Sequence, residues 1–226
     1  VSLWKQKLKK MARVTEGLNL NGTMGKLVFY QRNGKNYVRT KPATYRDAKT
    51  ETQLFARGRF AGCNSFYSLL RDDIFRLIWK VAATGTGKNA KNLFMQHNTY
   101  AFGKDKNIED YSRVHFSTGM LPLPNGLEFA RYNNRECLLQ WEYDAPKALG
   151  SPADRLYIVE LHTADLTADL TIRMHETDIC RSEGKALFST FYDVDEQTHL
   201  YCFWGNEQCT SFSADYYSGA IRLIAP

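Results

Sequence analysis

Hydrophobic and polar residues alternate along residues 27–40, a pattern typical of paired β-strands. Asn33-Gly34 lies at the centre of this stretch, and Asn-Gly is the preferred dipeptide of a two-residue type I′ turn because both central residues take positive φ. The turn predicts a β-hairpin in which Tyr30 pairs with Tyr37. Successive side chains of a strand point to opposite faces, so an apolar set suited to a core would face away from the tyrosines. That set is Leu27, Phe29 and Val38.

The hydrophobic period becomes helical between residues 49 and 102. Over residues 49–70 apolar residues recur every three or four positions, and Thr50 or Thr52 is placed to cap the helix. Two further helices are expected over residues 72–82 and 90–102. The apolar stripe expected on the first helix is Ala56, Phe60, Cys63, Tyr67 and Leu70.

Short strand-like segments separated by turn residues follow a connector at residues 103–125. Seven such segments favour an antiparallel β-sandwich, so the fold class is predicted to be α+β. The expected strands are residues 127–132, 137–143, 155–162, 170–175, 186–192, 199–204 and 208–213.

Basic and acidic residues are distributed unevenly along the chain, although its net charge is only +6. Residues 1–110 contain 21 Lys and Arg against 8 Asp and Glu, whereas residues 111–226 contain 9 against 16. This split predicts a basic hairpin-plus-helices domain at residues 1–110 and an acidic sandwich domain at residues 111–226, which would fold alone as a fragment of residues 118–226. A basic surface attracts polyanions, although many basic faces are simply solvated.

Three features of the second half resemble a fibronectin type III-like sandwich. Trp141 lies in the second strand-like segment, where that family buries a tryptophan, and residues 155–162 resemble its third strand. Tyr201 is positioned like the sixth-strand tyrosine whose hydroxyl ties down a corner. The resemblance covers roughly residues 120–220. It implies that a seven-stranded antiparallel fibronectin type III/Ig-like β-sandwich follows the N-terminal hairpin and helices.

Motifs of the first half resemble a large family of Bacteroidota proteins, a domain of unknown function. The hairpin has the form G-x-x-G-x-x-x-x-Y…G-K…V-R-x-x-P, and the helix after it has the form T-x-x-Q…R-x-x-F. The resemblance spans most of the chain from Met11. It implies no catalytic residues, because no activity is known for the family. The matching residues are Gly22, Gly25, Tyr30, Gly34, Lys35, Val38, Arg39, Pro42, Thr50, Gln53, Arg57 and Phe60.

The main functional clue is the predicted pair of Tyr30 and Tyr37, which lies among lysines and arginines on one face of the hairpin. Lysines and arginines suit phosphates and tyrosines stack on bases, which favours a non-enzymatic protein that binds nucleic acid or another polyanion. Tyr and Arg also anchor protein interfaces, so the alternative is a structural or interaction protein of a phage-like or surface assembly. Its partner would be another protein or a second copy of the chain. The candidate binding residues are Tyr30, Arg32, Lys35, Tyr37, Arg39, Lys41, Arg57 and Arg59.

Other chemistry is weakly indicated. Residues 83–91 depart from a phosphate-binding loop, because Asn89 stands where Ser or Thr would hold magnesium. Five cysteines without a C-x-x-C pair disfavour a disulfide framework or zinc site, although a turn at Gly205-Asn206 would bring Cys202 opposite Cys209. We expect no enzymatic turnover, no cofactor and no bound metal. We also expect a cytoplasmic protein without a membrane span, because no signal-peptide pattern or long apolar run is present.

Overall fold

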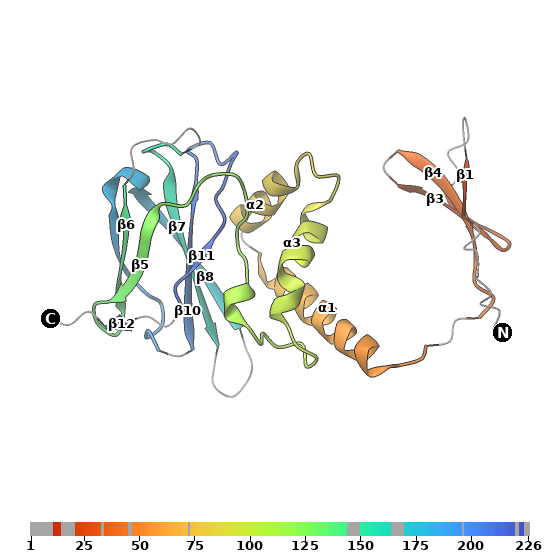
Figure 1. Cartoon of the computed structure of the whole chain (residues 1–226), viewed down its shortest axis with the longest axis horizontal. Coiled ribbons are helices and arrows are strands. Elements are labelled where there is room, and N and C mark those ends of the chain that lie inside the picture. The colour runs from red at the N-terminus through yellow and green to blue at the C-terminus, as the bar shows by residue number, and fades with distance from the viewer. Residues whose placement is uncertain are drawn as a thin grey trace, which may run out of the picture. The chain divides into compact units, whose positions relative to one another are not determined.

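The computed structural model describes residues 11–14, 21–32, 34–44, 47–71, 73–143, 150–163, 170–195, 197–219 and 222–223. Contacts divide the chain into two compact units, Val1–Lys49 and Thr50–Pro226. The first unit contains a β-sheet, and the second contains three α-helices and two further sheets (Figure 1). The fold class is therefore α+β. No helix in the described part of the chain is long and apolar enough to cross a membrane.

The sheet of the first unit is antiparallel and contains the predicted hairpin. Its strands run in the order β1-β4-β3-β2, and Tyr30 of β3 pairs with Tyr37 of β4, which confirms the predicted register. Gly34 has a φ of +70°, as a type I′ turn requires, whereas Asn33 lies outside the described residues. The strands are β1 (Met11–Val14), β2 (Gly22–Met24), β3 (Leu27–Arg32) and β4 (Lys35–Thr40).

The helices begin at residues that the sequence marks as caps. Thr50 and Gln53 form a capping box, in which the Gln53 N–H donates to Thr50 Oγ1 and the Thr50 N–H donates to Gln53 Oε1. Asn89 is the N-cap of the third helix, which explains its place in the rejected phosphate-loop motif. The helical elements are α1 (Glu51–Leu69), α2 (Asp73–Ala83), α3 (Ala90–Asn98), and the short 3-10 helices η1 (Thr99–Ala101), η2 (Tyr111–Arg113) and η3 (Arg181–Glu183).

The buried side of α1 differs from the predicted stripe. Phe60 is 58% exposed, whereas Gly58 and Gly62 are buried. A Cβ atom at Gly58 would lie 2.0 Å from the carbonyl oxygen of Lys104, and one at Gly62 would lie 2.4 Å from that of Lys106. The two glycines therefore let the connector backbone pack against α1. Because of this close approach, the first half of α1 buries the side that carries Gly58 and Gly62 and not the predicted stripe.

The second unit contains two sheets of four strands. One has the order β11-β10-β7-β8 and the other β12-β5-β6-β9; every pair is antiparallel except β12 with β5. The strands are β5 (Asn125–Arg131), β6 (Glu136–Glu142), β7 (Arg155–Thr163), β8 (Leu170–Cys180), β9 (Lys185–Ser189), β10 (Thr198–Gly205), β11 (Tyr216–Tyr217) and β12 (Arg222–Leu223).

The inner strands β7 and β10 of the sheet β11-β10-β7-β8 are buried on both faces. One face packs on the other sheet, with Trp141 and Trp204 in edge contact at 5.4 Å between ring centroids. The other face carries Val159 and Phe203 and shares a core with Trp79 of α2. The helices therefore form a third layer on this sheet (Figure 1). Burial on both faces explains the nearly continuous apolar sequence of β7 and β10.

The shared core bears on the predicted domain organisation. Along the chain, the boundary between the two compact units lies between Lys49 and Thr50, whereas the sequence suggests a boundary between residues 110 and 111. A fragment of residues 118–226 would lack all three helices and expose the sheet face that they cover. We therefore expect the helices and both sheets of residues 50–226 to unfold together.

The last predicted strand, residues 208–213, is instead mostly a turn. The side chain of Asn206 accepts hydrogen bonds from the N–H groups of Thr210 and Ser211, which closes the loop after β10. The edge position of the sheet is taken by β11. The predicted pairing of two cysteines is wrong for the same reason: Cys202 lies in the core between the sheets, whereas Cys209 packs against the helix-side core. Both are free thiols.

Candidate polyanion-binding face

The hairpin carries an aromatic pair between cations on one side of the N-terminal sheet. The rings of Tyr30 and Tyr37 are stacked, with centroids 5.5 Å apart and planes at 19°, and both residues are half-buried. Arg32, Lys35 and Arg39 are exposed. We call six hairpin residues on this side the tyrosine face: Val28, Tyr30, Arg32, Lys35, Tyr37 and Arg39.

Charge on the hairpin strands is confined to the tyrosine face. The opposite side carries Leu27, Phe29 and Val38 with uncharged polar residues, and no Asp or Glu occurs between Glu16 and Asp47 in the sequence. Two more exposed lysines flank the far end of the hairpin, where the Lys41 N–H donates to the Lys26 carbonyl oxygen at 2.6 Å. The cations of β3 and β4 and the two flanking lysines therefore lack acidic neighbours along the chain, and their electric fields add rather than cancel.

The apolar side of the hairpin is partly exposed. Leu27 is 38% exposed, and Phe29 and Val38 are half-buried. The expectation that this side packs in a core stays a prediction.

The two arginines predicted on the first helix lie in the other compact unit. Arg59 Nε donates to the carbonyl oxygen of Phe102 at 3.0 Å, and its guanidinium lies 4.4 Å from the ring centroid of Phe55. These contacts tie α1 to the segment after η1, which gives Arg59 a structural role. Arg57 is exposed on α1. The tyrosine face is defined by hairpin residues, and a role of Arg57 and Arg59 in the same binding site stays a prediction.

The sequence was compared with models of known protein families. Residues 19–202 match a family of unknown function, DUF6266. The chain belongs to DUF6266. The match includes the tyrosine face, all three α-helices and the strands from β2 to the middle of β10, so the resemblance to a domain-of-unknown-function family is confirmed. No curated protein matches the chain. The DUF6266 match therefore supplies a family but no activity.

The second unit of this DUF6266 chain holds a buried carboxylate that the sequence does not single out. Glu160 on β7 is fully buried and accepts hydrogen bonds from the N–H groups of Phe191 and Tyr192 at 2.8 and 2.9 Å. His175 Nε2 lies 3.2 Å from Oε2 of Glu160. These contacts anchor the segment after β9. Within the described ranges, no three His, Cys, Asp or Glu side chains gather as a metal-binding group.

A second cluster surrounds His199 on β10. Its ring stacks on Tyr111 at 3.6 Å between centroids, and its Nδ1 lies 2.9 Å from the Tyr217 hydroxyl. Burial lowers the pKa of His199 to about 4. Burial also raises the pKa of Tyr111 and of Tyr217. The cluster is therefore uncharged at neutral pH, and it links η2 to strands β10 and β11.

The low pKa of His199 predicts loss of stability in acid. In the unfolded chain this histidine titrates near its ordinary pKa of 6.5, so between pH 6.5 and about 4 the unfolded state binds the proton preferentially. We expect the urea midpoint to fall as the pH is lowered from 7 to 5. His199→Asn keeps an acceptor for the Tyr217 hydroxyl but has no titrating imidazole. It should therefore remove most of the part of the midpoint decrease that His199 causes.

Two other histidines are internal controls for this measurement. Burial lowers the pKa of His97, whereas the hydrogen bond to Asp215 raises the pKa of His115, so they act in opposite directions. An equal fall of the midpoint in wild type and in His199→Asn would contradict the assignment to His199.

Proposed function

We propose that this DUF6266 chain is a non-enzymatic binding protein whose tyrosine face binds nucleic acid or another polyanion. The observation that carries the proposal is the confinement of the hairpin's charge to one side, around a stacked tyrosine pair. A single-stranded nucleic acid offers both partners that this side suits, because its phosphates attract Arg and Lys and its bases stack on aromatic rings.

The dimensions of the face support a short binding site. A six-residue strand is about 20 Å long at about 3.3 Å per residue. Arg32 and Lys35 lie at the turn end of the hairpin, and Arg39 lies beyond the tyrosine pair toward the other end. Phosphates on either side of two stacked bases would therefore meet cations at both ends. A cytoplasmic location, where the free thiols would remain reduced, fits this proposal and stays a prediction.

Removing one cation should weaken binding in a salt-dependent manner. We expect Arg39→Ala to reduce affinity for labelled oligothymidine and to lower the slope of log K against log salt by about 0.7 for a lost single-strand phosphate contact. The matched control is Lys185→Ala, which removes the same charge from an exposed position on β9 in the other unit. Fluorescence anisotropy at several salt concentrations measures both slopes. Equal slopes for the two variants would contradict the proposed face.

Removing one ring should separate stacking from charge. Tyr37→Ala is expected to cost about 1–3 kcal/mol of binding free energy on oligothymidine and much less on a duplex of equal length, because duplex bases cannot stack on the ring. Thermal unfolding of the same variant is the companion measurement. A lower melting temperature with unchanged binding would assign the tyrosine pair a purely structural role.

The two sheets support a finer proposal, that the sandwich is of the fibronectin type III-like class. Such sandwiches keep their first, second and fifth strands in one sheet and their third, sixth and seventh in the other. The orders β5-β6-β9 and β11-β10-β7-β8 follow this rule, and Trp141 on the second strand is buried with its Nε1–H donating to the Arg181 carbonyl oxygen. Two features depart from the class: β12 pairs with β5 in parallel, and the Tyr201 hydroxyl donates to Tyr111 in the connector.

The apolar side of the hairpin favours a second candidate, a structural or interaction protein. Met24 is 66% exposed, and it shares this side with the incompletely buried Leu27 and Phe29. A protein partner or a second copy of the chain would cover such a surface. Purification at low salt, with and without nuclease, separates the candidates. Nucleic acid that co-purifies and is removed by high salt supports the first, whereas a clean protein that self-associates supports the second.

A further inference from the structure

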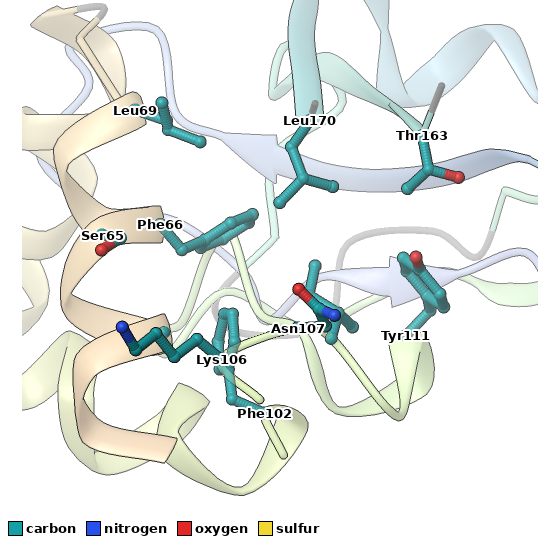
Figure 2. A pocket seen from close by; sticks show the side chains of 11 residues that line it. Ser65, Phe66, Leu69, Phe102, Lys106, Asn107, Tyr111, Thr163 and Leu170 are labelled. Carbon is teal, nitrogen blue, oxygen red and sulfur yellow. The ribbon is translucent and has the colours of Figure 1, made fainter. Parts of the chain in front are cut away.

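The second unit contains a cavity that is independent of the tyrosine face. It has a volume of about 450 Å³ and lies between α1, the connector after η1, and the adjoining ends of β7 and β8 (Figure 2). Its volume is within the range of small-molecule sites, which is about 300–1,000 Å³. The cavity also lies between layers of the fold, where such sites are common.

The walls of the cavity are held by contacts that do not depend on a ligand. The connector packs directly on Gly62 of α1, and Phe102 and Ile108 form an isolated β-bridge that closes the loop between them. The Gly103 N–H donates to the Asn107 carbonyl oxygen at 2.9 Å within this loop. On the opposite side, the buried Tyr201 hydroxyl donates to the carbonyl oxygen of Tyr111. The cavity is therefore part of the folded framework, and a ligand would meet a site that is already formed.

The lining has an apolar part and a polar part. Phe66 and Leu69 of α1 form one wall, and Leu170 projects toward them from β8 (Figure 2). Tyr111 and Thr163 lie together on the other side, and the amide of Asn107 lies between the two parts (Figure 2). Lys106 also borders the cavity, but its side chain runs along α1 and its ammonium group points away from the centre (Figure 2).

We propose that this cavity binds a small uncharged molecule with an apolar body and a hydroxyl, carbonyl or amide group at one end. The body would lie against Phe66, Leu69 and Leu170, where it removes apolar surface from water. The polar group would reach Asn107, Tyr111 or Thr163, whose side chains supply both donors and acceptors. A carboxylate in the same place would lose its hydration without a facing cation, and this cost selects against anionic ligands.

The probe for this site is N-phenyl-1-naphthylamine, an uncharged dye that fluoresces in apolar surroundings. We expect saturable binding at one site per chain. In competition with the dye, 1-decanol should displace it at a concentration at least ten times lower than decanoate. The two compounds have ten carbons each and differ at the end group, which is a neutral hydroxyl in 1-decanol and a carboxylate in decanoate. Equal displacement by the two compounds, or stronger displacement by decanoate, would overturn the proposed ligand chemistry.

Two leucines on α1 make a matched pair for locating the dye. Leu69 borders the cavity and is 43% exposed, whereas Leu54 is 42% exposed and does not line it. Leu69→Trp should fill the cavity and weaken dye binding at least tenfold, and Leu54→Trp should leave it within twofold of wild type. Because both positions are partly exposed, both variants should keep the wild-type melting temperature. Unchanged binding in Leu69→Trp, or no saturable binding in wild type, would refute the site.

A third variant tests the polar part of the cavity. Asn107 is exposed at the rim, so Asn107→Leu should fold normally. We expect it to weaken competition by 1-decanol several-fold and to leave direct binding of the dye unchanged. An unchanged effect of 1-decanol would remove Asn107 from the proposed hydrogen-bonding set.

Discussion

Arg181→Met should lower the free energy of unfolding by about 3–5 kcal/mol, because it would leave the buried carboxylate of Asp154 without its partner. The side chains of Arg181 and Asp154 are 8% and 1% exposed, and Nε lies 3.2 Å from Oδ2. The guanidinium also donates to the carbonyl oxygen of Pro122 at 2.8 Å and lies 5.5 Å from the centroid of a Trp204 ring. Urea denaturation followed by tryptophan fluorescence measures the loss.

The chain offers an exposed ion pair as a matched control. Arg135 and Asp193 are 62% and 60% exposed, with Nε at 2.8 Å from Oδ1. Solvent screens this pair, so Arg135→Met should cost less than about 1 kcal/mol. The double variant Arg181→Met with Asp154→Leu should recover part of the loss, because it removes the unpaired charge. If Arg181→Met and Arg135→Met cost the same, burial is not what makes the Arg181 pair important.

Gly58→Ala should destabilise the protein by about 3 kcal/mol, the upper part of the range for overpacking a core. Helix propensity alone predicts the opposite sign, since Ala is favoured over Gly inside a helix by about 1 kcal/mol. The new Cβ atom would lie 2.0 Å from the Lys104 carbonyl oxygen and 2.7 Å from its carbonyl carbon, so the connector backbone would have to move. The same denaturation experiment measures the change.

Another position on α1 tests the effect of helix propensity on stability without this backbone contact. Ser65 is exposed on α1, and Ser65→Ala should leave stability unchanged or raise it slightly. Gly62→Ala should behave like Gly58→Ala, because its Cβ atom would meet the Lys106 backbone. A gain of stability in Gly58→Ala would mean that the connector does not pack on α1 as described.

Local signals were enough to predict the hairpin and therefore the candidate binding face. Asn33-Gly34 and the alternation around it specify the turn, the register and the residues of each side, since all of these depend on neighbours in sequence. The same holds for the capping box of Thr50 and Gln53, whose hydrogen bonds span three residues. Six of the seven predicted strands lie where short apolar segments indicated them. The seventh was lost to a turn that the side chain of Asn206 stabilises.

Contacts between distant segments decided the rest. The buried side of α1 depends on the connector backbone at Lys104, which lies 46 positions after Gly58. No local sequence pattern predicts that this backbone packs against the glycine. The low pKa of His199 depends on burial beneath Tyr111, and the cavity is lined from α1, the connector, β7 and β8. Backbone dihedral preferences and short-range hydrogen bonds depend on residues that are neighbours in sequence. Close packing between layers arises only when the whole chain folds, so the tertiary structure alone located the cavity and the shared core.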